Sequence, residues 1–147
     1  MTTRSSGFTL IELLVVVAII GILSAVGVVS YTGYVTGAQK TAAENTLYQL
    51  ALAQTEFFTD NRVYKVGGES ECPATIDTTE DLVTALLGGT GIIPENFNFC
   101  ADTVDELRAD GSTRTIFQIT ATSTPASGLD CVIVINENNE LDKEGCP

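Results

Sequence analysis

The feature that most restricts this chain is residues 8–35, an apolar run with a single charged side chain, Glu12. Folded as a helix, the run is about 42 Å long at about 1.5 Å per residue. Roughly 20 apolar residues are enough to cross the hydrocarbon core of a bilayer. The run therefore predicts a long helix that is surrounded either by lipid or by other apolar helices.

Glu12 is the unusual residue of this run. A carboxylate inside a membrane helix costs about 2.5–3.5 kcal/mol on insertion scales, and such residues usually have a partner. The basic groups nearest in sequence are Arg4 and the amine at the start of the chain. Cleavage between Gly7 and Phe8 would create a new ammonium group on Phe8, in the turn that precedes Glu12. We therefore expect Glu12 to pair with a Phe8 amine, either its own or that of a neighbouring copy, and to complement the helix dipole.

The first residues form a short leader with one basic side chain that ends at Gly7, and the segment Phe8-Thr-Leu-Ile-Glu12 follows. This pattern resembles the class III leader and N-terminus of type IV pilins and of the related pseudopilins. The resemblance is strong over residues 4–34 and weak beyond them. It implies that a prepilin peptidase cleaves after Gly7 and N-methylates Phe8, and that Glu12 directs assembly. Unlike many pilins, the chain has no helix-kinking proline near Val29.

Two simpler interpretations of the N-terminus compete with this one. A secretory signal has a basic start, an apolar core and a small-residue cleavage site, for which Ala25-Val26-Gly27 would qualify. However, Glu12 would then lie within the apolar core, and the apolar run continues past Gly27. A plain membrane anchor accounts for the length of the run but not for the motif from Gly7 to Glu12.

The composition limits what the remainder of the chain does. Residues 36–147 are long enough for one modest domain. The chain has 7 basic and 19 acidic residues and a net charge of −12, and loss of the leader would remove Arg4. Sequence-independent nucleic-acid binding relies on clustered lysine and arginine, so no nucleic-acid partner is expected. Because the chain has no histidine, histidine-based catalytic triads and metal sites are excluded, and we expect no cofactor or metal.

The four cysteines all lie in the predicted head: Cys72, Cys100, Cys131 and Cys146. An even number of cysteines in an exported domain of this size indicates disulfides, and four cysteines allow three pairings. We favour Cys72–Cys100 and Cys131–Cys146, since each pair brackets a loop-rich segment. The second pair also resembles the disulfide-bounded C-terminal loop of type IV pilins. A zinc site is not expected because no C-x-x-C spacing is present.

After Tyr34 the apolar run becomes an amphipathic helix pattern. The apolar stripe consists of Ala43, Leu47, Leu50, Gln54 and Phe57, with Ala51 and Phe58 beside it. Strong helix formers continue to Phe58, and Asp60-Asn61 is a plausible stop. The pattern predicts one helix from Phe8 to about Thr59, whose second half packs on a head.

The head is expected to contain a short helix and a few strands. The short helix would be capped by Thr78 or Thr79 and ended by Gly88-Gly89. Strands are predicted at 96–100, 113–122 and 131–136, with a loop around Pro125, Ser127 and Gly128 between the last two. Residues 136–145 are predicted to be a solvated terminal loop, since they lack the calcium-loop pattern. Together these elements predict an α+β fold, the lollipop of type IV pilins, with three or four antiparallel strands.

The resemblance implies a division into a cleaved leader (1–7), a membrane and assembly half of the helix (8–35) and a soluble head (36–147). It implies a structural subunit of a homo-oligomeric helical filament, not an enzyme. The precursor would be inserted in the bacterial inner membrane, and its partners would be the prepilin peptidase/N-methyltransferase and the pilus assembly machinery. The product would be an extracellular pilus filament on the cell surface. Alternatives are a type II secretion pseudopilin, a minor pilin and a membrane-anchored binding module that does not polymerise.

A membrane-tethered hydrolase is a further alternative from a different class. Its candidate carboxylate pairs are Glu80/Asp81 and Asp105/Glu106. Adjacent residues of a helix do not face each other, so neither pair is well placed to share a substrate. Within the filament class, the residues do not distinguish motility, adhesion, DNA uptake and secretion.

Overall fold

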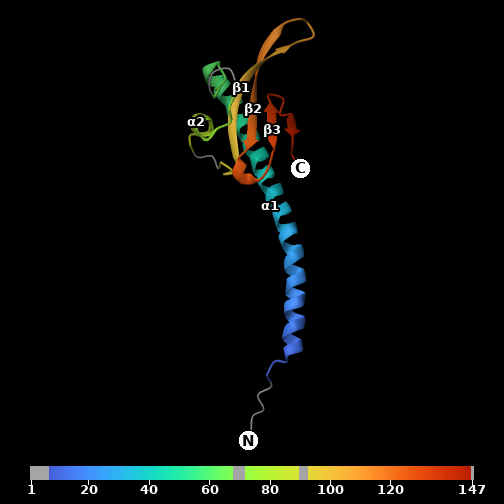
Figure 1. Ribbon diagram of the computed structural model, residues 1–147. Coiled ribbons are helices and arrows are strands. Elements are labelled where there is room, and N and C mark those ends of the chain that lie inside the picture. The colour runs from blue at the N-terminus through green and yellow to red at the C-terminus, as the bar shows by residue number, and fades with distance from the viewer. Residues whose placement is uncertain (1–6, 68–71, 90–92, 147) are drawn as a thin grey trace. The chain divides into compact units, whose positions relative to one another are not determined.

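The computed structural model describes residues 7–67, 72–89 and 93–146, except for the side chains of residues 28 and 29. The chain divides into two compact units, Met1–Gly37 and Ala38–Pro147. A long N-terminal helix precedes a four-stranded antiparallel sheet, so the predicted α+β class is confirmed (Figure 1). In chain order the elements are α1 (Leu10–Asn61), α2 (Ile76–Leu87), β1 (Phe97–Leu107), β2 (Thr113–Ser123), the 3-10 turn η1 (Pro125–Ser127), β3 (Val132–Asn136) and β4 (Leu141–Glu144).

In the second unit, α1 buries the stripe that its sequence pattern predicts. The buried positions are Ala43, Leu47, Leu50, Ala51 and Gln54, and Phe57 and Phe58 are half-buried. Spacings of three and four residues place these side chains on one side of the helix. The stripe is therefore confirmed as the surface that α1 contributes to the core.

The sheet is a meander in the order β1-β2-β3-β4, with every neighbouring pair antiparallel (Figure 1). Alternate residues of a strand face opposite sides, and one side of this sheet supplies the core. The fully buried large side chains on that side are Phe97, Phe99, Phe117, Ile119, Ile133 and Ile135. An ion pair of 2.8 Å between Lys143 of β4 and Glu44 of α1 shows that this side faces α1.

β1 is longer than the sequence predicts. The sequence pattern predicts that this strand ends at Cys100. In the structure it continues to Leu107, which pairs with Thr113 of β2. The extension is largely polar, so it lacks the alternation of buried apolar residues that marks a strand. Backbone pairing and the following turn hold it instead. In that turn the Ser112 amide and hydroxyl donate to Asp110 at 2.9 and 2.6 Å, which lowers the pKa of Asp110.

The prediction of a solvated loop over residues 136–145 is wrong in part, because Leu141–Glu144 forms β4. The side-chain oxygen of Asn136 accepts from the amides of Asn138 and Glu140, both at 3.0 Å, and Asn139 adopts a positive φ of 60°. This turn reverses the chain and lays β4 against β3. The strand is at the sheet edge and mostly charged, as edge strands often are, so its sequence shows no buried face.

The N-terminus of α2 also differs from the prediction. The capping residue is Thr75 rather than Thr78 or Thr79, and the helix begins at Ile76. Thr75 and Thr78 form a reciprocal capping box, with bonds of 3.3 and 2.9 Å. Thr79 instead accepts the Phe99 amide of β1 at 2.7 Å. The predicted C-terminus is confirmed, since Gly88 caps α2 with a φ of 65°.

Two disulfides are present, and they are the two pairs favoured from the sequence. Cys72, which precedes α2, is bonded to Cys100 in β1. Cys131, next to the start of β3, is bonded to Cys146, which follows β4. The second bond closes the open end of the β3–β4 hairpin. In the chain-entropy model, a loop of this length gains about 3 kcal/mol from such a bond.

We expect Gly145→Ala to destabilise the head by about 2 kcal/mol or more, because an added Cβ would lie 2.3 Å from the Asp130 carbonyl oxygen. Gly128→Ala is the matched control. Gly128 has nearly the same φ, 67° against 66°, but nothing within 4 Å of an added Cβ. The control should lose only about 1 kcal/mol of stability, the cost of placing a residue with a Cβ in a left-handed conformation. Thermal unfolding followed by circular dichroism measures both, and equal losses would contradict the clash.

Candidate functional site

The candidate site is the start of α1, where Thr9 and Glu12 form a capping interaction. Thr9 immediately precedes the helix, and its carbonyl accepts the Leu13 amide at 3.2 Å. The Glu12 amide donates to the Thr9 hydroxyl oxygen at 3.3 Å, and that hydroxyl donates to the Glu12 carboxylate, also at 3.3 Å. The Glu12 side chain is thus held in the first turn, where the helix dipole favours a negative charge.

Thr9 is a residue of this candidate site that was not predicted from the sequence. The signal was available, since threonine followed three residues later by glutamate is the spacing of a capping box. Gly7 and Phe8 lie outside the helix and are exposed. A carboxylate has about four acceptor positions, so Glu12 retains capacity for a cation after accepting the Thr9 hydroxyl. The structure therefore places Phe8, Thr9 and Glu12 together at one helix end.

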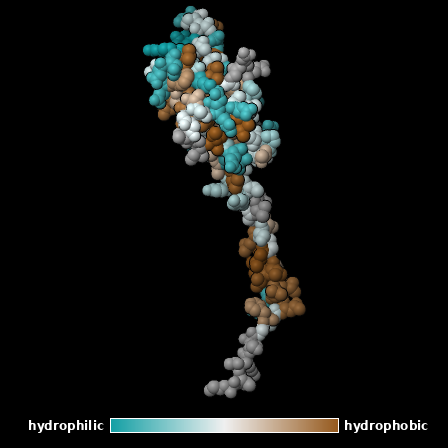
Figure 2. Space-filling view, turned by 90° about the vertical axis from the view of Figure 1, so that its left-hand side faces the viewer, coloured by the Kyte–Doolittle hydropathy of each residue, from teal (hydrophilic) through white to brown (hydrophobic). Residues whose placement is uncertain are grey.

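The apolar half of α1 presents its side chains outward. All described residues from Leu10 to Gly27 are exposed, and Figure 2 shows a brown, hydrophobic surface along this segment. The Ser24 hydroxyl donates to the Ile20 carbonyl at 2.7 Å, so this polar group is satisfied within the helix. By length and composition, α1 is the one helix in the described part of the chain that is suited to crossing a membrane.

Small residues interrupt this apolar surface. A Cβ added at Gly21 or Gly27 would meet nothing within 4 Å, so the fold of the single chain does not require glycine there. Gly21 and Ala25 have the small-xxx-small spacing that permits close approach of two helices. α1 nevertheless continues without a break from Leu10 to Asn61. The small residues are available for contacts with other helices.

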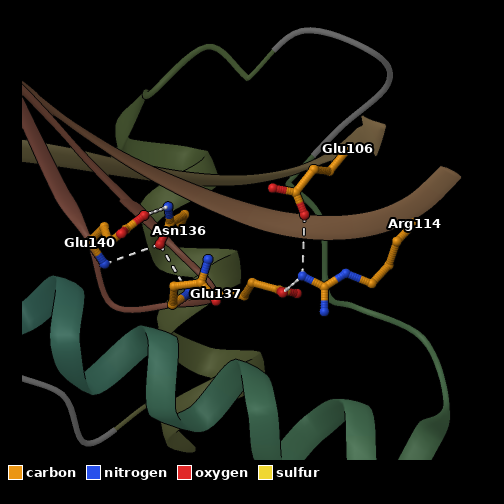
Figure 3. Close-up of polar contacts among 6 residues, drawn as sticks. Glu106, Arg114, Asn136, Glu137 and Glu140 are labelled. Atoms are coloured by element: carbon orange, nitrogen blue, oxygen red, sulfur yellow. Dashed lines mark hydrogen bonds and ion pairs between the residues drawn. The ribbon is translucent and has the colours of Figure 1, made fainter. Parts of the chain in front are cut away.

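A second polar cluster lies in the head, and Figure 3 shows its contacts. Arg114 of β2 forms ion pairs with Glu106 of β1 and with Glu137 in the turn after β3. Beside it, the side-chain amide of Asn136 donates to the Glu140 carboxylate at 2.9 Å. These contacts join the β1–β2 hairpin to the β3–β4 turn, so the role of the cluster is structural.

Three of the four carboxylates considered for hydrolysis have structural partners, and the fourth, Glu80, is exposed on α2. Asp81 forms an ion pair of 2.7 Å with Lys65, and Asp105 accepts the Thr115 hydroxyl at 2.8 Å. Glu106 pairs with Arg114. Within residues 7–67, 72–89 and 93–146, no three acidic or cysteine side chains are grouped so that they would hold a metal ion. These carboxylates therefore do not converge on a common substrate position.

Comparison with known families identifies two matching regions. Residues 2–28 match the prokaryotic N-terminal methylation motif. Residues 29–132 match the family described as type IV minor pilin ComP, DNA uptake sequence receptor. The boundary between the two matches falls within α1, so both regions contribute to the long helix.

Several curated relatives are fimbrial proteins. The chain is 37% identical over 84 residues to fimbrial protein Q of Moraxella bovis, covering 57% of this chain and 50% of that protein. It is 41% identical over 61 residues to the type IV major pilin protein PilA of Myxococcus xanthus, covering 42% and 28%. With fimbrial protein EcpC of Eikenella corrodens it shares 34% identity over 90 residues, covering 59% of each. The chain thus spans less than two thirds of each of these relatives, and no solved structure matches it significantly.

Proposed function

Because this chain belongs to the family of the type IV minor pilin ComP and carries the N-terminal methylation motif, we propose that it is a structural subunit of a type IV pilus-like filament. The observation that carries the proposal is Glu12, the only charge on the outward-facing apolar half of α1, held by Thr9 at the helix start. The relatives include both a minor pilin family and a type IV major pilin, so a minor and a major subunit are both alternatives within this proposal. The chain is not an enzyme, since its relatives are pilin subunits.

The proposed processing is cleavage between Gly7 and Phe8 and N-methylation of the new amine on Phe8. The methylation motif covers these residues, and both are exposed ahead of the helix. Cleavage would remove the leader 1–7 and leave residues 8–35 as the membrane and assembly segment, with 36–147 as the soluble head. The change from one compact unit to the other after Gly37 fits this division.

The same surface would serve two states of the protein. As a precursor, the apolar half of α1 lies in the inner membrane; in the filament, the same halves of many copies bundle together. Hydrocarbon is about as apolar as leucine, so the transfer between these states has little net hydrophobic drive. Pairing of Glu12 with a Phe8 amine gives the transfer a direction, because an unpaired carboxylate is costly in lipid. The peptidase and the pilus assembly machinery are the partners that this sequence of steps requires.

The description of the ComP family names a DNA uptake sequence receptor, and we do not propose that activity for this chain. DNA binding depends on basic groups that are free to neutralise phosphates. The chain has 7 basic against 19 acidic residues. Lys65, Arg114 and Lys143 each form an ion pair with a carboxylate of the same chain. A filament subunit with an acidic surface accounts better for this composition.

The experiment that tests the proposal is intact-mass and N-terminal analysis of material sheared from cells. We expect filaments that contain a chain beginning at a methylated Phe8, with all four cysteines oxidised. A chain that begins elsewhere would contradict the processing, and one that remains a single membrane-tethered molecule would support the binding module instead. The ratio of this chain to the main filament protein separates a minor from a major subunit.

A further inference from the structure

The head contains an open groove of about 460 Å³ at the C-terminal end of α1. Phe58 of α1 stacks on Tyr64 of the following segment, with ring centroids 4.4 Å apart, and Val63 adds an exposed apolar wall. Thr103 of β1 and Thr115 of β2 also line the groove. Burial, reinforced by the carboxylate of Glu137, raises the pKa of Tyr64, so its hydroxyl is neutral at physiological pH. The groove is therefore lined mainly by uncharged side chains, several of them apolar, and by the guanidinium of Arg62.

Arg62 lines the groove and has a backbone conformation that favours glycine. It has a φ of 61°, and its amide caps α1 by donating to the Phe58 carbonyl at 2.8 Å. Glycine is the usual residue at such a capping position, so the cap does not explain an arginine. The side chain is also unusual, because in this acidic protein it forms no ion pair within the described residues, whereas Lys65 does. A guanidinium beside an apolar groove suits an apolar group that carries a carboxylate.

The outer face of α1 has that chemistry. This outer face consists of Tyr48, Leu52 and Glu56, which follow each other at intervals of four residues and so lie on one side of the helix. Tyr48 is 43% exposed, Leu52 is 73% exposed, and Glu56 is exposed. Glu56 forms no ion pair with any residue that the structure describes. An exposed tyrosine and an exposed leucine followed by a carboxylate complement a largely uncharged groove that a guanidinium also lines.

We propose that the outer face of α1 of one copy docks in the groove of a neighbouring copy, with Glu56 paired to Arg62. This contact rests on the proposed function, which brings many copies together. The two surfaces differ, so the contact is heterologous and repeats from copy to copy, as an open helical assembly requires. Closing the groove would shield the pair from water and cover Val63 and Leu52, two apolar side chains that water now reaches.

Charge exchange tests the contact. We expect Arg62→Glu and Glu56→Arg each to lower the amount of this chain in sheared filaments by about tenfold, since each places like charges together. The double variant should recover most of the loss. Arg108→Glu is the control, because Arg108 also lacks an ion pair among the described residues and lies away from the groove, in the β1–β2 turn. Loss in Arg62→Glu without recovery in the double variant would mean a different occupant and overturn the proposal.

Arg62→Gly separates the contact from the fold. Glycine relieves the left-handed conformation, so we expect the thermal midpoint to rise by a few degrees while filament incorporation falls. A merely structural arginine would leave incorporation unchanged or improved, and that result would overturn the contact. Wild-type protein that forms no filaments would instead overturn the proposed function. If the wild-type protein forms filaments and the Arg62 and Glu56 variants are incorporated to the same extent, the contact alone would be overturned.

Discussion

Glu12→Ala should leave the chain in the membrane, cleaved after Gly7 like the wild type. Its incorporation into filaments should fall at least about tenfold. The physical reason is that the substitution acts oppositely on the two states. Alanine is cheaper than a carboxylate in lipid, by about 2.5–3.5 kcal/mol on insertion scales, so the membrane state gains stability. The filament, in contrast, would lose the proposed pairing of Glu12 with a Phe8 amine. Since 1.4 kcal/mol corresponds to a factor of ten, an effect of this size is readily measured by comparing membrane and sheared fractions.

Two further variants separate the charge of Glu12 from its capping role. Glu12→Gln keeps the length of the side chain and a polar end but removes the charge, so it should fail nearly as completely as alanine. Thr9→Ala removes both hydrogen bonds that join Thr9 and Glu12 but keeps the carboxylate. Loss of such a cap costs about 0.5–2 kcal/mol of helix stability, so Thr9→Ala should assemble with a smaller defect. If Thr9→Ala and Glu12→Ala were equally defective, the role of Glu12 would be capping rather than charge pairing.

Patterns that depend on neighbouring residues were the ones that the sequence predicted well. The stripe from Ala43 to Gln54 follows the helix period, and its burial requires only that some core exists. Gly88 ends α2 in a left-handed conformation, which is least costly for a residue without a Cβ. The motif of Gly7, Phe8 and Glu12 is also local, and the roles of these residues stay predictions.

Elements held mainly by backbone contacts with distant residues escaped prediction. The end of β1 and all of β4 are polar, so their side chains do not report pairing that the neighbouring strands impose. Thr75, Thr78 and Thr79 are all acceptable helix caps by residue type. The tertiary structure selects one of them, because the Thr79 hydroxyl already accepts a hydrogen bond from the Phe99 amide of β1. The groove escaped for the same reason, since Arg62 and Thr103 are brought together only by the tertiary structure.

Gly7→Val should block processing and leave the full-length precursor in the membrane, with no chain in filaments. An added Cβ at Gly7 would meet nothing within 4 Å, and the residue lies outside α1, so the substitution does not disturb the fold of the chain itself. Its effect would therefore act through the proposed peptidase, which would have to bring the backbone at Gly7 close to its catalytic groups. Glycine is the residue that permits such close approach of a backbone.

Gly7→Ala provides the graded control, because a single methyl group should slow cleavage less than the branched side chain of valine. Intact mass distinguishes the outcomes, since the uncut chain retains residues 1–7 and carries no methyl group on Phe8. The result also orders the two steps of the proposed pathway. Glu12→Ala should accumulate as a cleaved chain and Gly7→Val as an uncut one, although both are absent from filaments. Normal cleavage of Gly7→Val would place the scissile bond elsewhere and remove the Phe8 amine as the partner of Glu12.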